Sequence, residues 1–150
     1  MASQLPKISH VLELCLYAKH LSTSVTFYRD TLRLGPPVFE QPNRMAVFPL
    51  GQTSLLLFQR GATFSDWAAP QASNHIPGHG LPEGDTETKL RTHFALAVEK
   101  PEDVDRWDLK GKGVRILAKV DWPKGGRSVY FADPDEHCGE IASRGIWPHY

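Results

Sequence analysis

The chain has 150 residues, with 17 Lys or Arg and 17 Asp or Glu, so its formal net charge is zero. This balance offers no basic surface to a nucleic acid or an acidic membrane, and we expect neither partner. No apolar run approaches the roughly 20 residues of a membrane span, and the first residues lack the apolar core of a signal peptide. The two cysteines, Cys15 and Cys138, make no disulfide framework, so we expect a cytoplasmic protein.

The first part of the chain predicts a strand, a helix and three further strands. Residues 8–17 are rich in Val, Leu and Tyr and predict a strand buried on both faces, in which the carboxylate of Glu13 is anomalous. An amphipathic helix is predicted next, from apolar residues spaced by four, three and four: Leu21, Val25, Tyr28 and Leu32. Three short strands are expected after it, at residues 37–40, 44–50 and 53–59.

A long segment rich in proline and glycine, residues 61–90, separates this part from a second one. A connection of this length in a compact domain indicates a linker or a lid over a site. The second part again predicts a strand, at residues 91–98, and then a helix that begins at Pro101 and ends at Gly111 or Gly113. Strands near residues 114–120, 127–132 and 137–143 complete it.

The order strand-helix-strand-strand-strand therefore occurs twice, in a module at about 8–60 and a second at about 91–146. Glu13 and His93 open the first strand of each module, with an offset of 80 positions. The turns at Gly51 and Glu136 match at an offset of 85, which pairs Leu55 with Glu140. We expect the first strands of the two modules to lie side by side around a metal ion. His137 lies at the second turn, where we expect an exposed side chain.

Three stretches resemble the vicinal oxygen chelate superfamily, which includes glyoxalase I, bleomycin-resistance proteins, extradiol dioxygenases and fosfomycin-resistance enzymes. The resemblance covers the chain from about Ile8 to Ile146. The opening strand Leu12-Glu13-Leu14-Cys15-Leu16-Tyr17 with the helix around Phe27-Tyr28-Arg29-Asp30 looks like the start of the family's first module. Thr92-His93-Phe94-Ala95-Leu96 looks like the second opening strand, and the run from Phe131-Ala132-Asp133-Pro134 to Glu140 looks like the closing hairpin.

The resemblance implies an α+β fold of two βαβββ modules that form a curved mixed sheet around a concave metal and substrate site. Carried over by position, the family's four ligand places fall on Glu13, Leu55, His93 and Glu140. Leu55 cannot bind a metal, so a three-ligand site of Glu13, His93 and Glu140 is implied. Two departures from the family pattern are Glu13, where many members have His, and Glu136, where a turn Gly is usual.

Two carboxylates and one imidazole suit a divalent ion such as Zn²⁺, Ni²⁺, Mn²⁺, Fe²⁺ or Co²⁺. Three protein ligands leave positions free for water or substrate, which is typical of a catalytic site. The alternative to a metal site is a structural role for these residues, in which Glu13 forms an ion pair with an arginine and His93 is a hydrogen-bonded core histidine. Strand parity places Cys15, Cys138 and Tyr17 on the same face as the ligands.

Candidate substrate contacts come from the strands and the loops. The hydroxyl of Tyr17 can serve a substrate, although a core tyrosine is the alternative. Glu140 and His79, which lies between Gly78 and Gly80, are both candidate catalytic residues. We expect His75 to be solvated. Trp122 can form a pocket wall. Arg127 can bind a substrate carboxylate or phosphate, or pair with Asp121 or Asp133 to shape its loop.

The sequence therefore predicts a small metal-dependent enzyme of glyoxalase type, acting on an oxygenated metabolite in an isomerase, lyase or dioxygenase step. We expect a homodimer. The alternative is a metal-free protein of the bleomycin-resistance kind, which sequesters a planar ligand in a crevice at a dimer interface. Aromatic side chains would line that crevice: Trp67, Trp122 and Trp147.

Overall fold

A computed structural model of the chain describes residues 5–68, 70 and 73–150. The first module contains β1 (Glu13–Ala18), α1 (Leu21–Thr26), a π-helical continuation η1 (Phe27–Thr31), β2 (Phe39–Gln41), β3 (Met45–Leu50) and β4 (Thr53–Gln59). The second contains β5 (His93–Ala97), α2 (Pro101–Asp105), β6 (Ile116–Asp121), β7 (Arg127–Ala132) and β8 (Cys138–Ala142). The predicted α+β class with two βαβββ modules is confirmed.

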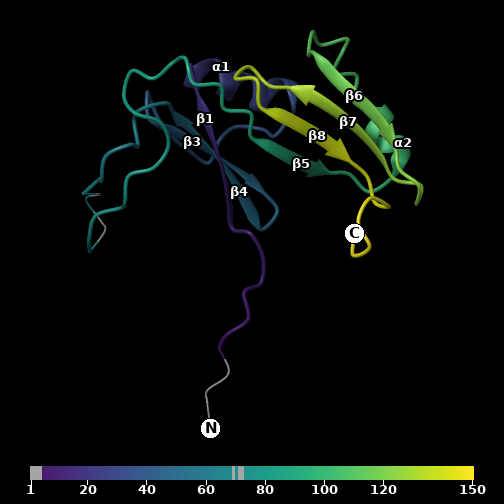
Figure 1. Cartoon of the computed structure of the whole chain (residues 1–150), viewed down its shortest axis with the longest axis horizontal. Coiled ribbons are helices and arrows are strands. Elements are labelled where there is room, and N and C mark those ends of the chain that lie inside the picture. The colour runs from purple at the N-terminus through teal and green to yellow at the C-terminus, as the bar shows by residue number, and fades with distance from the viewer. Residues whose placement is uncertain (1–4, 69, 71–72) are drawn as a thin grey trace.

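Each module forms its own four-stranded mixed sheet, so the expected curved sheet is divided in two within one chain (Figure 1). The strand orders are β1-β4-β3-β2 and β5-β8-β7-β6. The pairs β1–β4 and β5–β8 are parallel, and the remaining pairs are antiparallel. The first strand of each module, β1 or β5, is consequently an edge strand of its sheet.

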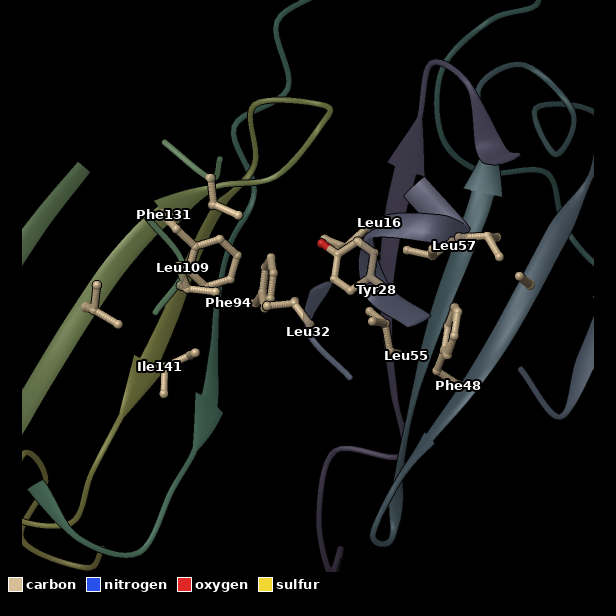
Figure 2. Packing of buried hydrophobic residues seen from close by; sticks show 14 of the residues in the cluster. Leu16, Tyr28, Leu32, Phe48, Leu55, Leu57, Phe94, Leu109, Phe131 and Ile141 are labelled. Atoms are coloured by element: carbon tan, nitrogen blue, oxygen red, sulfur yellow. The ribbon is translucent and has the colours of Figure 1, made fainter. Parts of the chain in front are cut away.

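The helix of the first module packs between the two sheets and joins their cores. The four predicted stripe residues are all buried: Leu21, Val25, Tyr28 and Leu32. Figure 2 shows Tyr28 and Leu32 directed towards Phe94 of the second module, with Leu16, Leu55 and Leu57 behind them in the first. One apolar core therefore spans both modules, which fixes the position of one module against the other.

The second helix is shorter than its sequence predicts. It begins at Pro101 as expected but ends at Asp105, and the segment to Gly113 consists of turns. The carboxylate of Asp108 accepts a 2.9 Å hydrogen bond from the backbone N–H of Gly111. Such a local bond from Asp competes with helical pairing, which explains why the helix stops early.

The first strand also differs from its prediction. It begins at Glu13 rather than at residue 8, and residues 5–12 are exposed, although the carbonyl oxygens of Val11 and Leu12 still accept hydrogen bonds from Thr53 and Ser54 at the start of β4. Its side chains alternate, with Leu16 and Ala18 buried and Glu13 exposed, so the strand is buried on one face and not on both.

The segment between the modules carries little regular structure among its described residues, where Trp67 and Ile76 form an isolated bridge. No helix in the described part of the chain is long and apolar enough to cross a membrane.

Candidate metal and substrate site

His93 and Glu140 face each other on the concave side of the second sheet. In the parallel pair β5–β8, His93 lies opposite Cys138 and Ala95 opposite Glu140, so the two side chains are diagonal neighbours on one face. His93 Nε2 is 3.4 Å from Glu140 Oε2. Two ligand atoms bound tetrahedrally to one ion at about 2.1 Å each would be separated by about 3.4 Å. The spacing of the pair therefore fits two ligands of one divalent ion.

The backbone orients the His93 ring for this role. His93 Nδ1 is 3.0 Å from the carbonyl oxygen of Cys138, and because a carbonyl can only accept, Nδ1 carries the proton of that bond. Nε2 is then the ring nitrogen that faces Glu140. Metal-binding histidines are characteristically held in this way, by a hydrogen bond from the second ring nitrogen.

Glu140 is buried and is held by a chain of hydrogen bonds. The hydroxyl of Ser128 donates to Glu140 Oε1 at 2.5 Å, and the indole N–H of Trp122 donates to the Ser128 oxygen at 2.9 Å. This leaves Oε2 to face His93. Trp122, predicted as a substrate contact, thus lies behind Glu140 with its N–H already engaged.

Tyr130 completes this side of the site. Its ring stacks on that of His93, with the ring centroids 5.9 Å apart. Burial raises the pKa of Tyr130, and the negative charge of Glu140 raises it further, so the phenol stays protonated at neutral pH. The same two causes, burial and then Glu140, raise the pKa of the Cys138 thiol.

Glu13 is not brought to this pair. It is exposed on β1, an edge strand of the other sheet. Across residues 5–68, 70 and 73–150, no group of three or more His, Cys, Asp or Glu side chains is arranged to hold a metal ion. The structure therefore supplies two of the three expected ligands at one place in a single chain, and the third elsewhere.

The predicted pairing of Leu55 with Glu140 is wrong by one residue. Leu55 lies opposite Leu14 and is fully buried in the core, on the face away from Glu13. Leu56 lies opposite Cys15, as Glu140 lies opposite Ala95. The last strands of the two modules, β4 and β8, correspond at an offset of 84 positions, whereas the turn residues Gly51 and Glu136 correspond at an offset of 85. The position is still occupied by leucine and cannot bind a metal.

Tyr17 and His79 meet on the concave face of the first sheet. Tyr17 Oη is 2.6 Å from His79 Nδ1. Burial raises the pKa of Tyr17, and the nearby Cys15 raises it further, so the phenol keeps its proton at neutral pH.

The segment around His79 is fitted closely to this strand. The backbone N–H of His79 donates to the carbonyl oxygen of Thr63 at 2.7 Å, and the Thr63 hydroxyl donates to the His79 carbonyl at 3.0 Å. A Cβ at Gly80 would lie 2.4 Å from the Tyr17 ring, which is closer than atoms tolerate. Glycine at this position lets the segment lie across the face of β1.

Arg127 is not brought to the concave face. On β7, Ser128 faces Glu140, and the neighbouring residue Arg127 points to the other side. Its guanidinium pairs with Asp121 at 2.8 Å and with Asp105. The structure thus shows the loop-shaping role for Arg127, with Asp105 in place of Asp133.

Three residues of the site were not identified from the sequence. Ser128 and Tyr130 are two positions apart on β7, and their parity opposite Glu140 in the hairpin was the available signal. His137, expected to be exposed, is fully buried. Its ring reaches backbone groups 45 and 120 positions away, which no local pattern reveals.

Comparisons with known proteins agree with this geometry. Residues 7–141 match the model of the Glyoxalase/Bleomycin resistance protein/Dioxygenase superfamily. A crystal structure of lactoylglutathione lyase from Agrobacterium tumefaciens is similar, with 28% identity, a TM-score of 0.79, and coverage of 95% of this chain and 99% of that one.

Two curated sequences are also similar to the chain. Metallothiol transferase FosB from Staphylococcus epidermidis is 27% identical over 138 residues, covering 90% of this chain and 82% of that protein. The uncharacterized protein YraH from Bacillus subtilis is 29% identical over 137 residues, covering 87% and 95%. The chain therefore belongs to the glyoxalase/bleomycin resistance protein/dioxygenase superfamily.

Proposed function

We propose that this protein is a metal-dependent enzyme of glyoxalase type, acting on a small oxygenated metabolite in an isomerase, lyase or dioxygenase step. Glu13, His93 and Glu140 would hold one divalent ion, of the Zn²⁺, Ni²⁺, Mn²⁺, Fe²⁺ or Co²⁺ group. Such an ion would supply Lewis acidity to the substrate oxygens bound beside it. Free Cys15 and Cys138 agree with a reducing, cytoplasmic location, which forms part of the proposal.

The observation that carries this proposal is the His93–Glu140 pair. Its 3.4 Å separation equals the spacing of two ligand atoms on one ion, and both side chains are held in place before any ion binds. Cys138 fixes the imidazole through Nδ1, and Ser128 fixes the carboxylate through Oε1.

The third ligand would come from a second copy of the chain. β1 and β5 are both edge strands, with one side of each unpaired within its sheet. An exposed strand edge is a template for pairing with another chain. If β1 of one copy pairs with β5 of another, Glu13 and His93 are placed on neighbouring strands. The proposed enzyme is therefore a symmetric homodimer with a site shared between its chains.

The Tyr17–His79 pair would contact the part of the substrate farthest from the ion. Tyr17 is four residues along β1 from Glu13 on the same face, about 13 Å away at the rise of a strand. The shared hydrogen bond engages Nδ1 of His79, so Nε2 is the ring nitrogen that is left for a substrate. His79 would bind or protonate a substrate oxygen there, and Glu140 would accept a proton near the ion.

The relatives with named activities are a lyase and a metallothiol transferase, both enzymes, which favours catalysis over sequestration of a ligand. The three tryptophans named for a sequestering crevice also have separate surroundings. Arg44 covers Trp67 at 4.4 Å, Trp122 binds Ser128, and Trp147 is exposed.

Metal retention tests the proposal. Protein purified without a histidine tag is soaked separately in Mn²⁺, Fe²⁺, Ni²⁺ and Zn²⁺, desalted and analysed for metal. We expect one ion per chain in the wild type and none in His93→Ala. His75→Ala removes an exposed loop histidine and should retain the wild-type amount. Wild-type protein that retains none of the four ions would contradict the proposal.

A further inference from the structure

His137 is a fully buried histidine whose two ring nitrogens both bind backbone groups. The backbone N–H of Thr92 donates to Nδ1 at 3.2 Å, and Nε2 is 3.1 Å from the carbonyl oxygen of Tyr17. Since an N–H can only donate and a carbonyl can only accept, the ring is neutral with its hydrogen on Nε2.

These two backbone groups belong to the strands that carry the proposed ligands. Tyr17 is on β1 with Glu13, and Thr92 immediately precedes His93 on β5. β1 and β5 belong to different sheets and share no ladder within one chain. The His137 ring is therefore a direct bridge from the strand of one ligand to the strand of another.

The turn that contains His137 attaches the two modules at further points. Asp133 accepts a 2.8 Å hydrogen bond from Tyr28, and Asp135 accepts 2.6 Å bonds from the Ser24 hydroxyl and the Lys19 backbone N–H. We call this turn, residues 133–137, the clasp. Its aspartates hold the helix and the end of β1, whereas His137 reaches both ligand-bearing strands.

We infer that His137 is a positioning residue that fixes the ligand strands β1 and β5 relative to each other, an inference that rests on the proposed function. Its ring binds backbone groups of these strands, so it acts on the ligands through the strands that carry them. The neutral ring offers one acceptor and one donor on opposite sides, which glutamine can only partly reproduce. In a shared site, a shift of either strand would misplace a ligand in each of the two sites.

Three variants test this role. His137→Leu removes both hydrogen bonds, and His137→Gln keeps a neutral donor. Tyr28→Phe removes the neighbouring hydrogen bond of the clasp, to Asp133, and leaves both hydrogen bonds of His137 in place, so it serves as the matched control. For each, the affinity for Mn²⁺ is measured by electron paramagnetic resonance of the free ion, alongside the thermal midpoint.

We expect His137→Leu to bind Mn²⁺ about tenfold more weakly, as is typical when an outer support of a metal site is lost. His137→Gln should fall between His137→Leu and the wild type. Tyr28→Phe should lower the thermal midpoint but keep the wild-type affinity. Wild-type affinity in His137→Leu, or an equal loss in Tyr28→Phe, would overturn the inference.

Amide hydrogen exchange separates this inference from the metal proposal, because it needs no ion. If the wild type retains none of Mn²⁺, Fe²⁺, Ni²⁺ and Zn²⁺, the proposed function fails, and the role of His137 is read from the Thr92 amide alone. That amide should exchange faster in His137→Leu than in Tyr28→Phe, measured relative to the slow core amide of Phe131. Exchange of Thr92 at the wild-type rate in His137→Leu would overturn the positioning role.

Discussion

The hydroxyl of Tyr28 in the first module donates a 2.8 Å hydrogen bond to the carboxylate of Asp133 in the second, and both groups are buried. Tyr28 lies in the core that the two modules share (Figure 2), so the bond crosses the boundary between them. Asp133 Oδ1 also accepts the backbone N–H groups of Asp135 and His137, so its carboxylate organises the clasp as well. Together with the bond from Ser24 to Asp135, this contact connects the helix of one module to the turn before β8.

Removal of this hydroxyl should weaken folding. Tyr28→Phe leaves Asp133 Oδ2 buried without its donor, which should lower the free energy of unfolding by about 1–3 kcal/mol. Urea unfolding measures the change. Tyr150→Phe, which removes a 3.2 Å hydrogen bond to Val98 near the C-terminus, is the control and should change stability less. Equal unfolding midpoints for Tyr28→Phe and the wild type would show that the bond carries no net stability.

The outer support of Glu140 should control metal affinity. Ser128→Ala frees Glu140 Oε1, so the carboxylate can turn away from His93, and we expect about a tenfold loss in affinity for the ion. Ser143→Ala is the matched control, because Ser143 is another buried serine, and its hydroxyl accepts the backbone N–H of Arg127 instead. Isothermal titration with Zn²⁺ compares the two variants. An equal loss in both would attribute the effect to general destabilisation.

The rate at which each cysteine is alkylated should depend on the carboxylate that lies near its thiol. Burial and then the nearby carboxylate raise the pKa of both thiols, with Glu13 acting on Cys15 and Glu140 on Cys138. Replacing the carboxylate by an amide lowers the thiol pKa, so more thiolate is present at pH 8 and alkylation is faster by a few-fold.

Each substitution should act on its own cysteine. Glu140→Gln should accelerate alkylation of Cys138 but not of Cys15, and Glu13→Gln should do the reverse. Mass spectrometry of metal-free protein treated with iodoacetamide resolves the two sites. Acceleration of both thiols by either substitution would indicate a change in exposure rather than in pKa.

Glu136 has a left-handed backbone, with φ of 66°, where the equivalent turn of the first module has Gly51 with φ of 60°. This conformation is strained for any residue with a Cβ, so Glu136→Gly should stabilise the fold by up to about 1 kcal/mol. Gly51→Ala should destabilise it by a similar amount. Glu136→Ala is the control, because it removes the exposed Arg115 pair but keeps the strain. Equal stability of the Gly and Ala variants would contradict this account.

Hydrophobic spacing predicted the fold well, because the core is built from local periodic patterns. The stripe from Leu21 to Leu32 is buried as expected, and residues 53–59 and 127–132 form strands with the predicted limits. The proximity of His93 and Glu140 was implied by the family resemblance, which places one ligand position on the first and one on the last strand of each module.

The remaining features depend on contacts between distant residues. The turns correspond at an offset one residue larger than the strands do, so the strand position that matches Glu140 is Leu56 and not Leu55. The difference matters because successive side chains of a strand point to opposite faces of the sheet. His137 is buried through bonds to Tyr17 and Thr92, which lie far away in the sequence. The division into two sheets could not be predicted either, because the same strand patterns fit one continuous sheet or two separate sheets.

Complementation between two defective chains tests the shared metal site most directly. Glu13→Ala and His93→Ala chains, carrying different tags, are refolded together, and the mixed dimers are isolated and analysed for metal. In a mixed dimer, one shared site combines Glu13 from the His93→Ala chain with His93 and Glu140 from the other, so it is intact. We predict one ion per mixed dimer and none in either parent dimer. Mixed dimers without metal, beside wild-type dimers that retain it, would contradict a site shared between chains.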